Sequence, residues 1–520
     1  MLSLIGQVGL AREIKNIILV IGDGMGPQQI GFLETFWKFG PKAPYSNKQQ
    51  SWYKTLSQNG KNSLSMHYPA EALVTDSACS ATQLAIGEAA GSEMIGINQK
   101  GNLKQNLVEI AVGRGKATGI ISDTRATHAT PAAFLAHTAH RSEENAIASQ
   151  IIDSGADLIL SGGLRHFLPN NLDKNPKLLA SLQKKTGGGF TLSSKRKDSK
   201  NLLQLAEQKG FSLVFDQKSL LKAQRLPLLG LFSDSGMYDG IKDFRTRESI
   251  LRTQPTLAQM TRKGLQLLSK NKNGFFLMVE AGQIDWAGHQ NDAGWLLWEM
   301  FKLDETLGVI HQFIQGRNDT LVVITADHET GGFGISYNSR KLPKKQKLTG
   351  TAFKEKYYQP MFNFGQPSLM QKLMAQSRSF EDIFREFSKL PKKKQNANSL
   401  VTLVNQASVF KIDKNAANRI LKVTSNDYYV AGHPTLGERK SPKIFDFRSF
   451  YPYGMGSRSN LLARELAAKQ NVVWSTGTHT HTPVPVLSVG AASYLFPSGI
   501  LHHVEIGKFL KNIIAKPAHE

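Results

Sequence analysis

The sequence of 520 residues contains a single cysteine, Cys79, so no disulfide can form within the chain. This scarcity does not identify the compartment, because exported proteins need not carry disulfides. No uninterrupted apolar run approaches the roughly 20 residues that a helix needs to cross a bilayer, and the chain is therefore expected to be soluble. The stretch 1–10 is apolar without a basic segment before it. It fits the tail of an export signal and an ordinary N-terminal extension equally well.

Acidic residues are few relative to basic ones: 41 Asp and Glu against 64 Lys and Arg give a formal net charge of +23. Such a balance is typical of proteins that bind nucleic acids or membrane surfaces. Here much of the excess is scattered over polar segments such as 195–200, 341–347 and 392–394. This pattern favours solvated surface loops. We therefore predict no specific nucleic-acid partner, with attraction of anionic substrates as a secondary effect.

Hydrophobic residues make up 40% of the chain, enough for a sizeable core. Short apolar runs bounded by glycine or polar residues indicate buried parallel strands. These runs span residues 16–21, 118–122, 274–279 and 320–325, and helical patterns such as 257–268 and 292–314 lie between them. Strands that alternate with helices predict an α/β fold, a three-layer sandwich with a central, mostly parallel β-sheet flanked by helices.

Residues 336–435 interrupt this alternation. The segment is rich in Lys, Gln, Asn and Ser, and it lacks apolar strand-like runs until Tyr428. We interpret it as a large surface insertion with some helices, such as 380–390, inside one domain that spans residues 1–520.

Several of the predicted strands are followed by residues that can bind metals. Asp23 follows the first strand, Glu280 the third, and the pair Asp327 and His328 the fourth. In an open α/β sheet, ligands bind outside the carboxyl ends of the strands. These side chains are therefore expected to converge on one crevice.

The glycine cluster 22–26 around Asp23 has two interpretations. A glycine-rich turn after a strand can bind a dinucleotide, but the Asp23 carboxylate would repel the pyrophosphate. A metal-binding aspartate on a tight glycine turn fits better. Aspartates also end strands for turn geometry alone, so this motif is weak by itself.

Two further motifs contain histidine. Asp285 and His289 are four residues apart, so on a helix they share one face and offer an oxygen and a nitrogen donor, which suits zinc. An ordinary Asp–His hydrogen bond is the alternative. His479 and His481 would share one face of a strand, and their spacing does not decide between ligands and surface residues.

Ser77 lies between Asp76 and a helix-like stretch that ends at Ile86. Asp76 can cap this helix without any further function. Alternatively, the Ser77 hydroxyl lies at a helix N-terminus, where backbone N–H groups and the dipole favour an anion. No G-x-S-x-G turn surrounds Ser77, so as a nucleophile it would need activation by a metal.

Six separated motifs occur in a fixed order along the chain: Gly22-Asp-Gly-Met-Gly26, Thr75-Asp-Ser-Ala78, His128-Ala-Thr-Pro131, Glu280 with Asp285 and His289, Thr325-Ala-Asp-His328, and His479-Thr480. Together they are far more specific than any one of them. The sequence resembles the alkaline phosphatase family over nearly its whole length.

The resemblance implies hydrolysis of phosphate monoesters, with broad specificity for the alcohol, through a phosphoserine intermediate at a two-zinc plus magnesium site. Ser77 would be the nucleophile, and Arg141 would bind the phosphate. The metal ligands would be Asp285, His289 and His479 for the first zinc, Asp23, Asp327 and His328 for the second, and Asp23, Thr130 and Glu280 for a third metal, normally magnesium.

Two positions vary within the family. His128 stands where some bacterial members have aspartate; it would touch the shell of the third metal directly or through water, and imidazole favours zinc over magnesium. Trp286 removes a cation that some members place near the phosphate, so weaker phosphate binding and faster release are expected. His481 has no family role and is expected in the surroundings of the site or at the surface.

The long insertion, together with these positions, is most similar to the large-loop bacterial branch of the family, which includes cold-active marine enzymes. This similarity implies a homodimer in which the loop clasps the partner, and a periplasmic or secreted location. The nearest alternatives are a phosphodiesterase or sulfatase with the same metal core, but Arg141 and the third-metal set favour monoesters. A nucleic-acid-binding protein with a vestigial metal site is disfavoured by the intact ligand positions.

Overall fold

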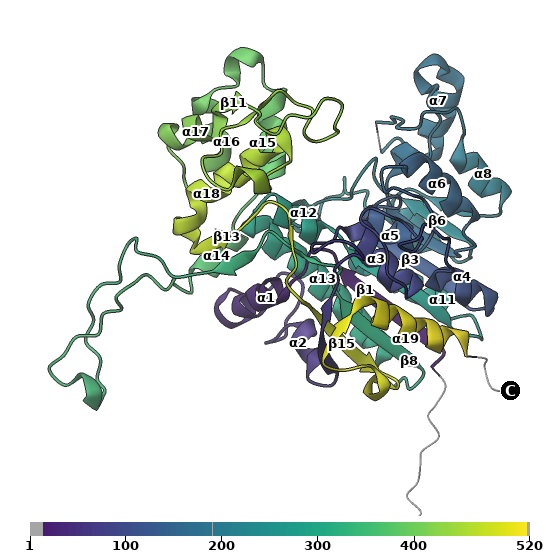
Figure 1. The fold of residues 1–520 in the computed structure, drawn as a ribbon, viewed down its shortest axis with the longest axis horizontal. Coiled ribbons are helices and arrows are strands. Elements are labelled where there is room, and N and C mark those ends of the chain that lie inside the picture. Colours follow the sequence, from purple (N-terminus) through teal and green to yellow (C-terminus); the bar gives the residue numbers. More distant parts are fainter. Residues whose placement is uncertain (1–13, 190, 517–520) are drawn as a thin grey trace, which may run out of the picture.

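The structure, a computed structural model, describes residues 14–189 and 191–516. The stretch 1–10, interpreted above as a signal tail or an extension, lies outside the described residues. A β-sheet lies at the centre of the body (Figure 1). It has ten strands, in the order β16-β2-β15-β8-β1-β7-β3-β4-β6-β5. The strands are β1 (Asn16–Gly22), β2 (Lys61–Met66), β3 (Ala117–Arg125), β4 (Leu158–Gly162), β5 (Ser212–Val214), β6 (Leu228–Leu231), β7 (Phe275–Ala281), β8 (Thr320–Thr325), β15 (Val484–Gly490) and β16 (Ile500–His502).

Strand direction in this sheet is uniform apart from β15, which runs antiparallel to both of its neighbours, β8 and β2. The four strands predicted from apolar runs are β1, β3, β7 and β8, and they lie together as β8-β1-β7-β3. The structure therefore confirms the predicted α/β fold with a mostly parallel central sheet.

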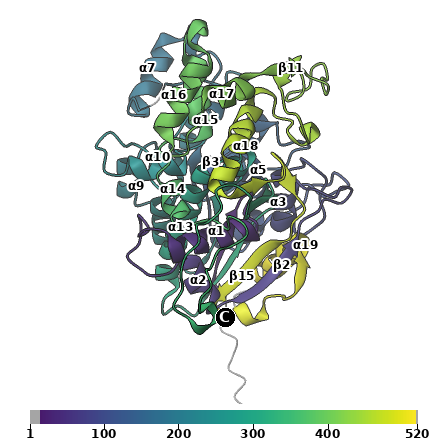
Figure 2. The same ribbon diagram turned by 90° about the vertical axis from the view of Figure 1, so that its left-hand side faces the viewer.

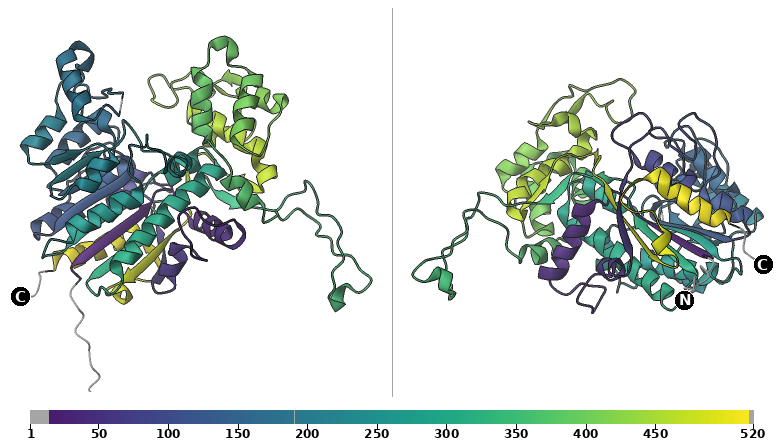
Figure 3. Two further views of the ribbon diagram at one scale, coloured as in Figure 1. Left: turned by 180° about the vertical axis from the view of Figure 1, so that it is seen from behind. Right: turned by 60° about the horizontal axis from the view of Figure 1, so that its bottom comes forward.

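Helices cover both faces of the sheet, with a separate apolar core on each side (Figures 1 and 3). Side chains alternate along β1: Ile18 and Val20 enter one core, and Ile17 and Leu19 enter the other. One face carries α1 (Pro27–Phe39), α2 (Trp52–Ser57), α9 (Gln217–Lys222), α10 (Gly240–Arg245), α11 (Leu257–Leu268) and α13 (Ala293–Ile314). The other carries α3 (Ser77–Ile86), α4 (Leu107–Gly113), α5 (Ala129–Ala133), α6 (Glu144–Asp153), α7 (Pro176–Lys185), α8 (Leu202–Gln208) and α19 (His503–Ala515).

Capping residues set the starts of the two helices predicted between strands. Thr256 and Gln259 form a capping box at the start of α11. Asp292 caps α13 by accepting a hydrogen bond from the Trp295 backbone N–H at 3.1 Å. The predicted helix 257–268 is α11, and the predicted helix 292–314 is α13 together with its cap, Asp292.

A long excursion begins after β10 (Phe333–Ile335) and ends at β13 (Val472–Trp474), the two strands of a small separate sheet. These two strands pair antiparallel, with Ile335 opposite Val472. The segment predicted as an insertion, 336–435, lies within this excursion. Its first part is an extended arm that carries the 3-10 helix η3 (Thr351–Phe353) and projects from the body (Figures 1 and 3).

The rest of the excursion forms a helical lobe. It contains α14 (Leu369–Met374), α15 (Phe380–Lys389), α16 (Ala397–Ala407), α17 (Lys414–Leu421), β11 (Val423–Ser425), β12 (Lys440–Pro442), the 3-10 helix η6 (Gly454–Ser457) and α18 (Arg458–Gln470). In Figure 2, α15, α16, α17 and β11 of this lobe lie near the top, while β2, β15 and α19 lie in the lower part. Across residues 14–189 and 191–516, the structure contains no helix with the length and apolarity that a membrane crossing demands.

Candidate metal centre

The carboxyl ends of three neighbouring parallel strands meet at one edge of the sheet. Ile21 of β1 lies opposite Glu280 of β7 on one side and Thr325 of β8 on the other. Asp23 and Asp327 leave the sheet two residues beyond these positions. The structure thus brings together the strand-end residues that the sequence analysis placed in one crevice.

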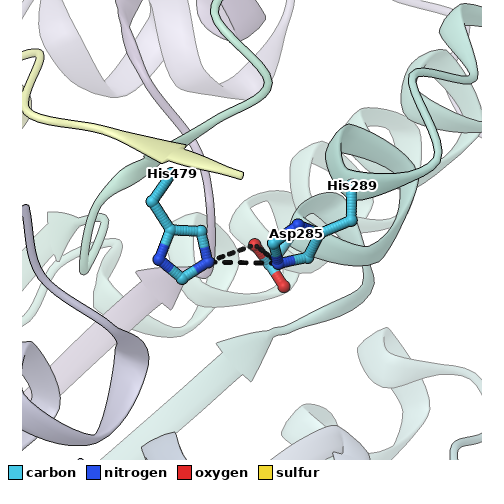
Figure 4. A group of neighbouring side chains, drawn as sticks. All are labelled: Asp285, His289 and His479. Atoms are coloured by element: carbon cyan, nitrogen blue, oxygen red, sulfur yellow. Dashed lines mark hydrogen bonds and ion pairs between the residues drawn. The ribbon is translucent and has the colours of Figure 1, made fainter. Parts of the chain in front are cut away.

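The first group of possible metal ligands is Asp285, His289 and His479. Asp285 and His289 lie on α12 (Gln283–His289), and His479 begins β14 (His479–Thr480). Figure 4 shows both imidazoles and the carboxylate pointing toward one another. The Asp285 Oδ1 atom is 3.3 Å from His289 Nε2 and 3.4 Å from His479 Nε2.

The Nδ1 atoms of both imidazoles bond to backbone carbonyls, His289 to Gly477 and His479 to Thr75, each at 2.8 Å. These bonds turn the Nε2 atoms toward the shared site, as is usual for metal-binding histidines. Burial alone would raise the pKa of Asp285, but the adjacent His289 and His479 hold it well below its usual range. The two imidazoles therefore favour the ionised form of this carboxylate, the form that binds metals.

The second group is Asp23, Asp285 and His328, with Asp327 beside it. The Nε2 atom of His328 is 3.6 Å from Asp23 Oδ1 and 3.2 Å from Asp327 Oδ2. Ser77 Oγ lies 3.2 Å from the same Nε2 atom. Burial and the surrounding carboxylates raise the pKa of Asp23 well above its usual range and that of Asp327 to about 8. A cation placed among these groups would relieve this repulsion.

The third group is Asp23, His128 and Glu280. His128 Nδ1 lies 3.9 Å from Glu280 Oε1, and Thr130 Oγ1 lies 3.3 Å from Asp23 Oδ2. The other Glu280 oxygen accepts hydrogen bonds from Ser122 and from Thr124, the latter at 3.0 Å. His128 thus lies close enough to Asp23 and Glu280 to share a metal ion with them; the resemblance leaves open contact either directly or through water.

Several buried ligand atoms in these groups have no hydrogen-bond partner among the described residues. They are Asp23 Oδ1, His128 Nδ1, Glu280 Oε1 and Asp327 Oδ2. Leaving buried polar atoms unpaired costs roughly 1–3 kcal/mol each, and more when they are charged. Oxygen and nitrogen donors that converge without partners match the donor set of a divalent metal site.

Ser77 is the first residue of α3, and Asp76 is its N-cap. The Asp76 carboxylate accepts hydrogen bonds from the backbone N–H groups of Ala78 at 3.0 Å and Cys79 at 3.4 Å. It also accepts one from Arg141 Nη1 at 3.0 Å. The predicted cap is therefore present, and it places the predicted phosphate-binding arginine next to the serine at a helix N-terminus.

A cleft of about 770 Å³ opens over these residues. Trp286 lines it, with its ring edge-on to His128 at 5.9 Å. The aromatic ring fills the space over Gly236, where a Cβ atom would lie 2.4 Å from it. His481 is exposed and belongs to none of the three groups.

Sequence reasoning did not find the ion cluster that holds α12 in place. The buried Lys302 ammonium of α13 lies 2.6 Å from Asp123 and 2.8 Å from Glu299. Asp123 in turn accepts a hydrogen bond at 2.7 Å from the N–H of Gly282, which precedes α12. Lys302 lies in a mainly apolar stretch of the sequence, but that pattern does not indicate which distant carboxylates it pairs with.

Comparison with known proteins places the chain in a family. The model of the alkaline phosphatase family matches residues 14–424. Alkaline phosphatase 3 of Bacillus subtilis (strain 168) is 29% identical over 513 residues, covering 96% of this chain and 89% of that protein. The solved structure of the cold-active alkaline phosphatase from a psychrophilic Shewanella sp. is similar with a TM-score of 0.67 at 25% identity, covering 96% of this chain and 100% of that one.

Thermus thermophilus alkaline phosphatase shares the fold, with a TM-score of 0.75 at 23% identity over 100% of this chain and 97% of that one. The family match extends over most of the chain and includes the motifs that build the three groups, up to His328. The chain therefore belongs to the alkaline phosphatase family and is a phosphatase.

Proposed function

We propose that this enzyme hydrolyses phosphate monoesters through a phosphoserine intermediate on Ser77, at a site that binds two zinc ions and one magnesium ion. The observation that carries the proposal is the set of unpaired, buried donor atoms gathered beside the Ser77 hydroxyl. His328 Nε2, only 3.2 Å from Ser77 Oγ, links this hydroxyl to the donor set.

The residues present fit such metals. Asp285, His289 and His479 would hold one zinc ion, and Asp23, Asp327 and His328 the other. Asp23, Thr130 and Glu280 would hold magnesium, with His128 also within reach. When bound, the cations supply Lewis acidity that activates the serine hydroxyl and a water and stabilises the leaving oxygen.

Ser77 and Arg141 would carry out the protein's own part. The Ser77 oxygen, having lost its proton to solvent, forms a bond to phosphorus while the bond from phosphorus to the alcohol oxygen breaks, and the alcohol leaves with a proton taken from water. Water then attacks the phosphoserine, which releases inorganic phosphate and restores the hydroxyl. Arg141 presents a planar fork to two phosphate oxygens, and Asp76 holds it in place.

Specificity follows from which atoms are held. The proposed contacts of Ser77, Arg141 and the metals are all made to the phosphoryl group, so the enzyme is expected to hydrolyse phosphate esters of many different alcohols. Trp286 brings no positive charge to the cleft. Inorganic phosphate would therefore be bound less tightly, and released faster, than in a site with a lysine there.

We also propose a homodimer and, from the sequence resemblance, a periplasmic or secreted location. The arm of residues 336–368 extends from the body and exposes aromatic side chains, among them Tyr337, Tyr357, Phe362 and Phe364. Contact with a second copy would cover these rings. Sedimentation should give a dimer for the full chain and a monomer after deletion of residues 340–364, and a monomeric full chain would contradict the proposal.

Chelation tests the metal requirement. Excess EDTA should abolish hydrolysis of an aryl phosphate, and zinc with magnesium should restore it, with both metals found by elemental analysis. Full activity in excess EDTA would overturn the metal mechanism. Rates on a monoester, a diester and a sulfate ester separate the proposed activity from its nearest alternatives.

A further inference from the structure

The cleft above Ser77 has a second wall that the phosphoryl chemistry does not use. Besides the candidate ligands and Arg141, it is lined by residues of the helical lobe, including Phe384 and Arg385 of α15 and Tyr453 and Met455 at η6. Its volume of about 770 Å³ lies in the range of sites that enclose a drug-sized ligand. Space therefore remains for the alcohol part of an ester.

Buried hydrogen bonds fix this wall relative to the candidate ligands. The start of α15 is tied to Asp292, which accepts from the Phe380 N–H at 2.7 Å. On α18, the Asn460 amide donates to the His289 carbonyl at 2.8 Å and to Asn291 at 2.7 Å. The lobe is thus attached to the segment that follows α12, and these bonds position the wall relative to the candidate ligands.

Beside the charged Glu381 and Arg385 of α15, this wall presents aromatic and apolar side chains. The ring of Tyr453 stands edge-on to His289, with centroids 5.0 Å apart. Phe384 and Met455 are only partly buried, and Trp286 faces the same cleft. Partly exposed rings and a thioether around one cavity favour contact with another aromatic ring.

The expected position of the leaving alcohol points to the same wall. In an in-line displacement, the attacking and leaving oxygens lie on opposite sides of phosphorus. Ser77 contacts His328, so the leaving oxygen faces the other group, Asp285, His289 and His479. Tyr453 packs directly on that group.

We propose that Phe384, Tyr453, Met455 and Trp286 form a subsite for the alcohol, and that it selects phosphate monoesters whose alcohol carries an aromatic ring. This inference rests on the proposed monoesterase function. The subsite adds to that function a preference for aromatic alcohols within a broad range of accepted alcohols.

The test compares 2-phenylethyl phosphate with ethyl phosphate, because both alcohols have similar acidity and differ by the ring. In the metal-loaded enzyme, we expect kcat/KM for 2-phenylethyl phosphate to be about tenfold higher than for ethyl phosphate. Contacts between aromatic rings stabilise a complex by an amount that corresponds to about a factor of ten. Calorimetric binding of 2-phenylethylphosphonate and ethylphosphonate, which are not hydrolysed, should show the same order without turnover.

Substitutions assign the preference to the wall. Phe384→Ala and, separately, Met455→Ala should each lower the kcat/KM ratio several-fold, because the phenyl ester loses more than the ethyl ester. Phe445→Ala is the matched control: Phe445 lies in the same excursion, is 69% exposed and does not line the cleft. It should leave both rates unchanged.

The outcomes separate the two levels of the proposal. A ratio near one in the wild type, or equal losses on both esters in Phe384→Ala and Met455→Ala, would overturn the alcohol subsite while leaving the monoesterase intact. If the metal-loaded enzyme hydrolyses neither ester, the proposed function is overturned, and the subsite with it.

Discussion

Asp76 connects the two residues that would handle the phosphoryl group. One carboxylate oxygen accepts hydrogen bonds from the Ala78 N–H and from Arg141 Nη1, both at 3.0 Å. The other accepts from the Glu93 N–H at 2.7 Å and from Cys79. The same side chain therefore begins the helix that carries Ser77 and orients Arg141 beside it.

Replacing Asp76 should affect both roles. In Asp76→Ala, Arg141 loses its fixed orientation, and we expect the inhibition constant for inorganic phosphate to rise about tenfold, since part of a charge-assisted contact is lost. Loss of the cap should lower the free energy of unfolding by about 1 kcal/mol. Steady-state inhibition and urea unfolding measure the two effects.

Asp76→Asn separates these effects, because asparagine caps a helix as well as aspartate does but carries no charge. We expect it to keep the wild-type stability and still raise the phosphate inhibition constant. Equal destabilisation by Asn and Ala would contradict the capping role of this side chain.

Lys302 should be required for stability. Its ammonium is buried between Asp123 and Glu299, so Lys302→Met would leave two carboxylates without their counter-charge. We expect a loss of roughly 3–5 kcal/mol in the free energy of unfolding, measured by urea unfolding of the metal-free protein. Lys508→Met on the exposed side of α19 is the control and should change stability by less than about 0.5 kcal/mol. A loss below about 1 kcal/mol for Lys302→Met would show that the cluster does not hold α13 and α12 together.

His67 should make the fold sensitive to acid. Burial lowers the pKa of His67 to about 4, while in the unfolded chain it is near 6.5. Below pH 6.5 the unfolded state binds a proton that the folded state does not, so stability falls as the pH drops from 6.5 toward 4. The loss attributable to this side chain is about 3 kcal/mol.

The His67→Gln variant tests this assignment, because glutamine can still donate to the Thr482 carbonyl, which lies 3.0 Å from His67 Nε2. Unfolding is followed from pH 7 to pH 4.5 in excess chelator, so that metal release in acid does not contribute. We expect a shallower dependence of stability on pH in the variant. Identical slopes would assign the acid sensitivity to other groups.

Local signals in the sequence were sufficient for the centre of the fold. The run 320–325 is β8 as predicted, and the rule that ligands gather at strand ends brought Asp23, Glu280 and Asp327 to one edge. These features depend on hydrophobic pattern and on chain direction, which a sequence contains directly. The assignment of Ser77 and Arg141, in contrast, depended on the resemblance to a family.

Other features depend on contacts between distant residues, for which the sequence holds no local signal. Lys302 lies on α13 and Asp123 on β3, and only the tertiary fold brings these two side chains together. The antiparallel strand β15 is placed between β8 and β2 by pairing across the sheet. Tyr453 reaches His289 only because the lobe folds back over α12.

Acid-quenched trapping of phosphate on the protein tests the central claim, that Ser77 is the nucleophile. Enzyme reconstituted with zinc and magnesium is mixed with a radiolabelled monoester, quenched in acid and mapped by peptide mass spectrometry. We expect label on Ser77 in the wild type and in Ser80→Ala, which alters the next serine of α3, and no label and no turnover in Ser77→Ala. Labelled phosphate trapped on the Ser77→Ala protein would contradict the account.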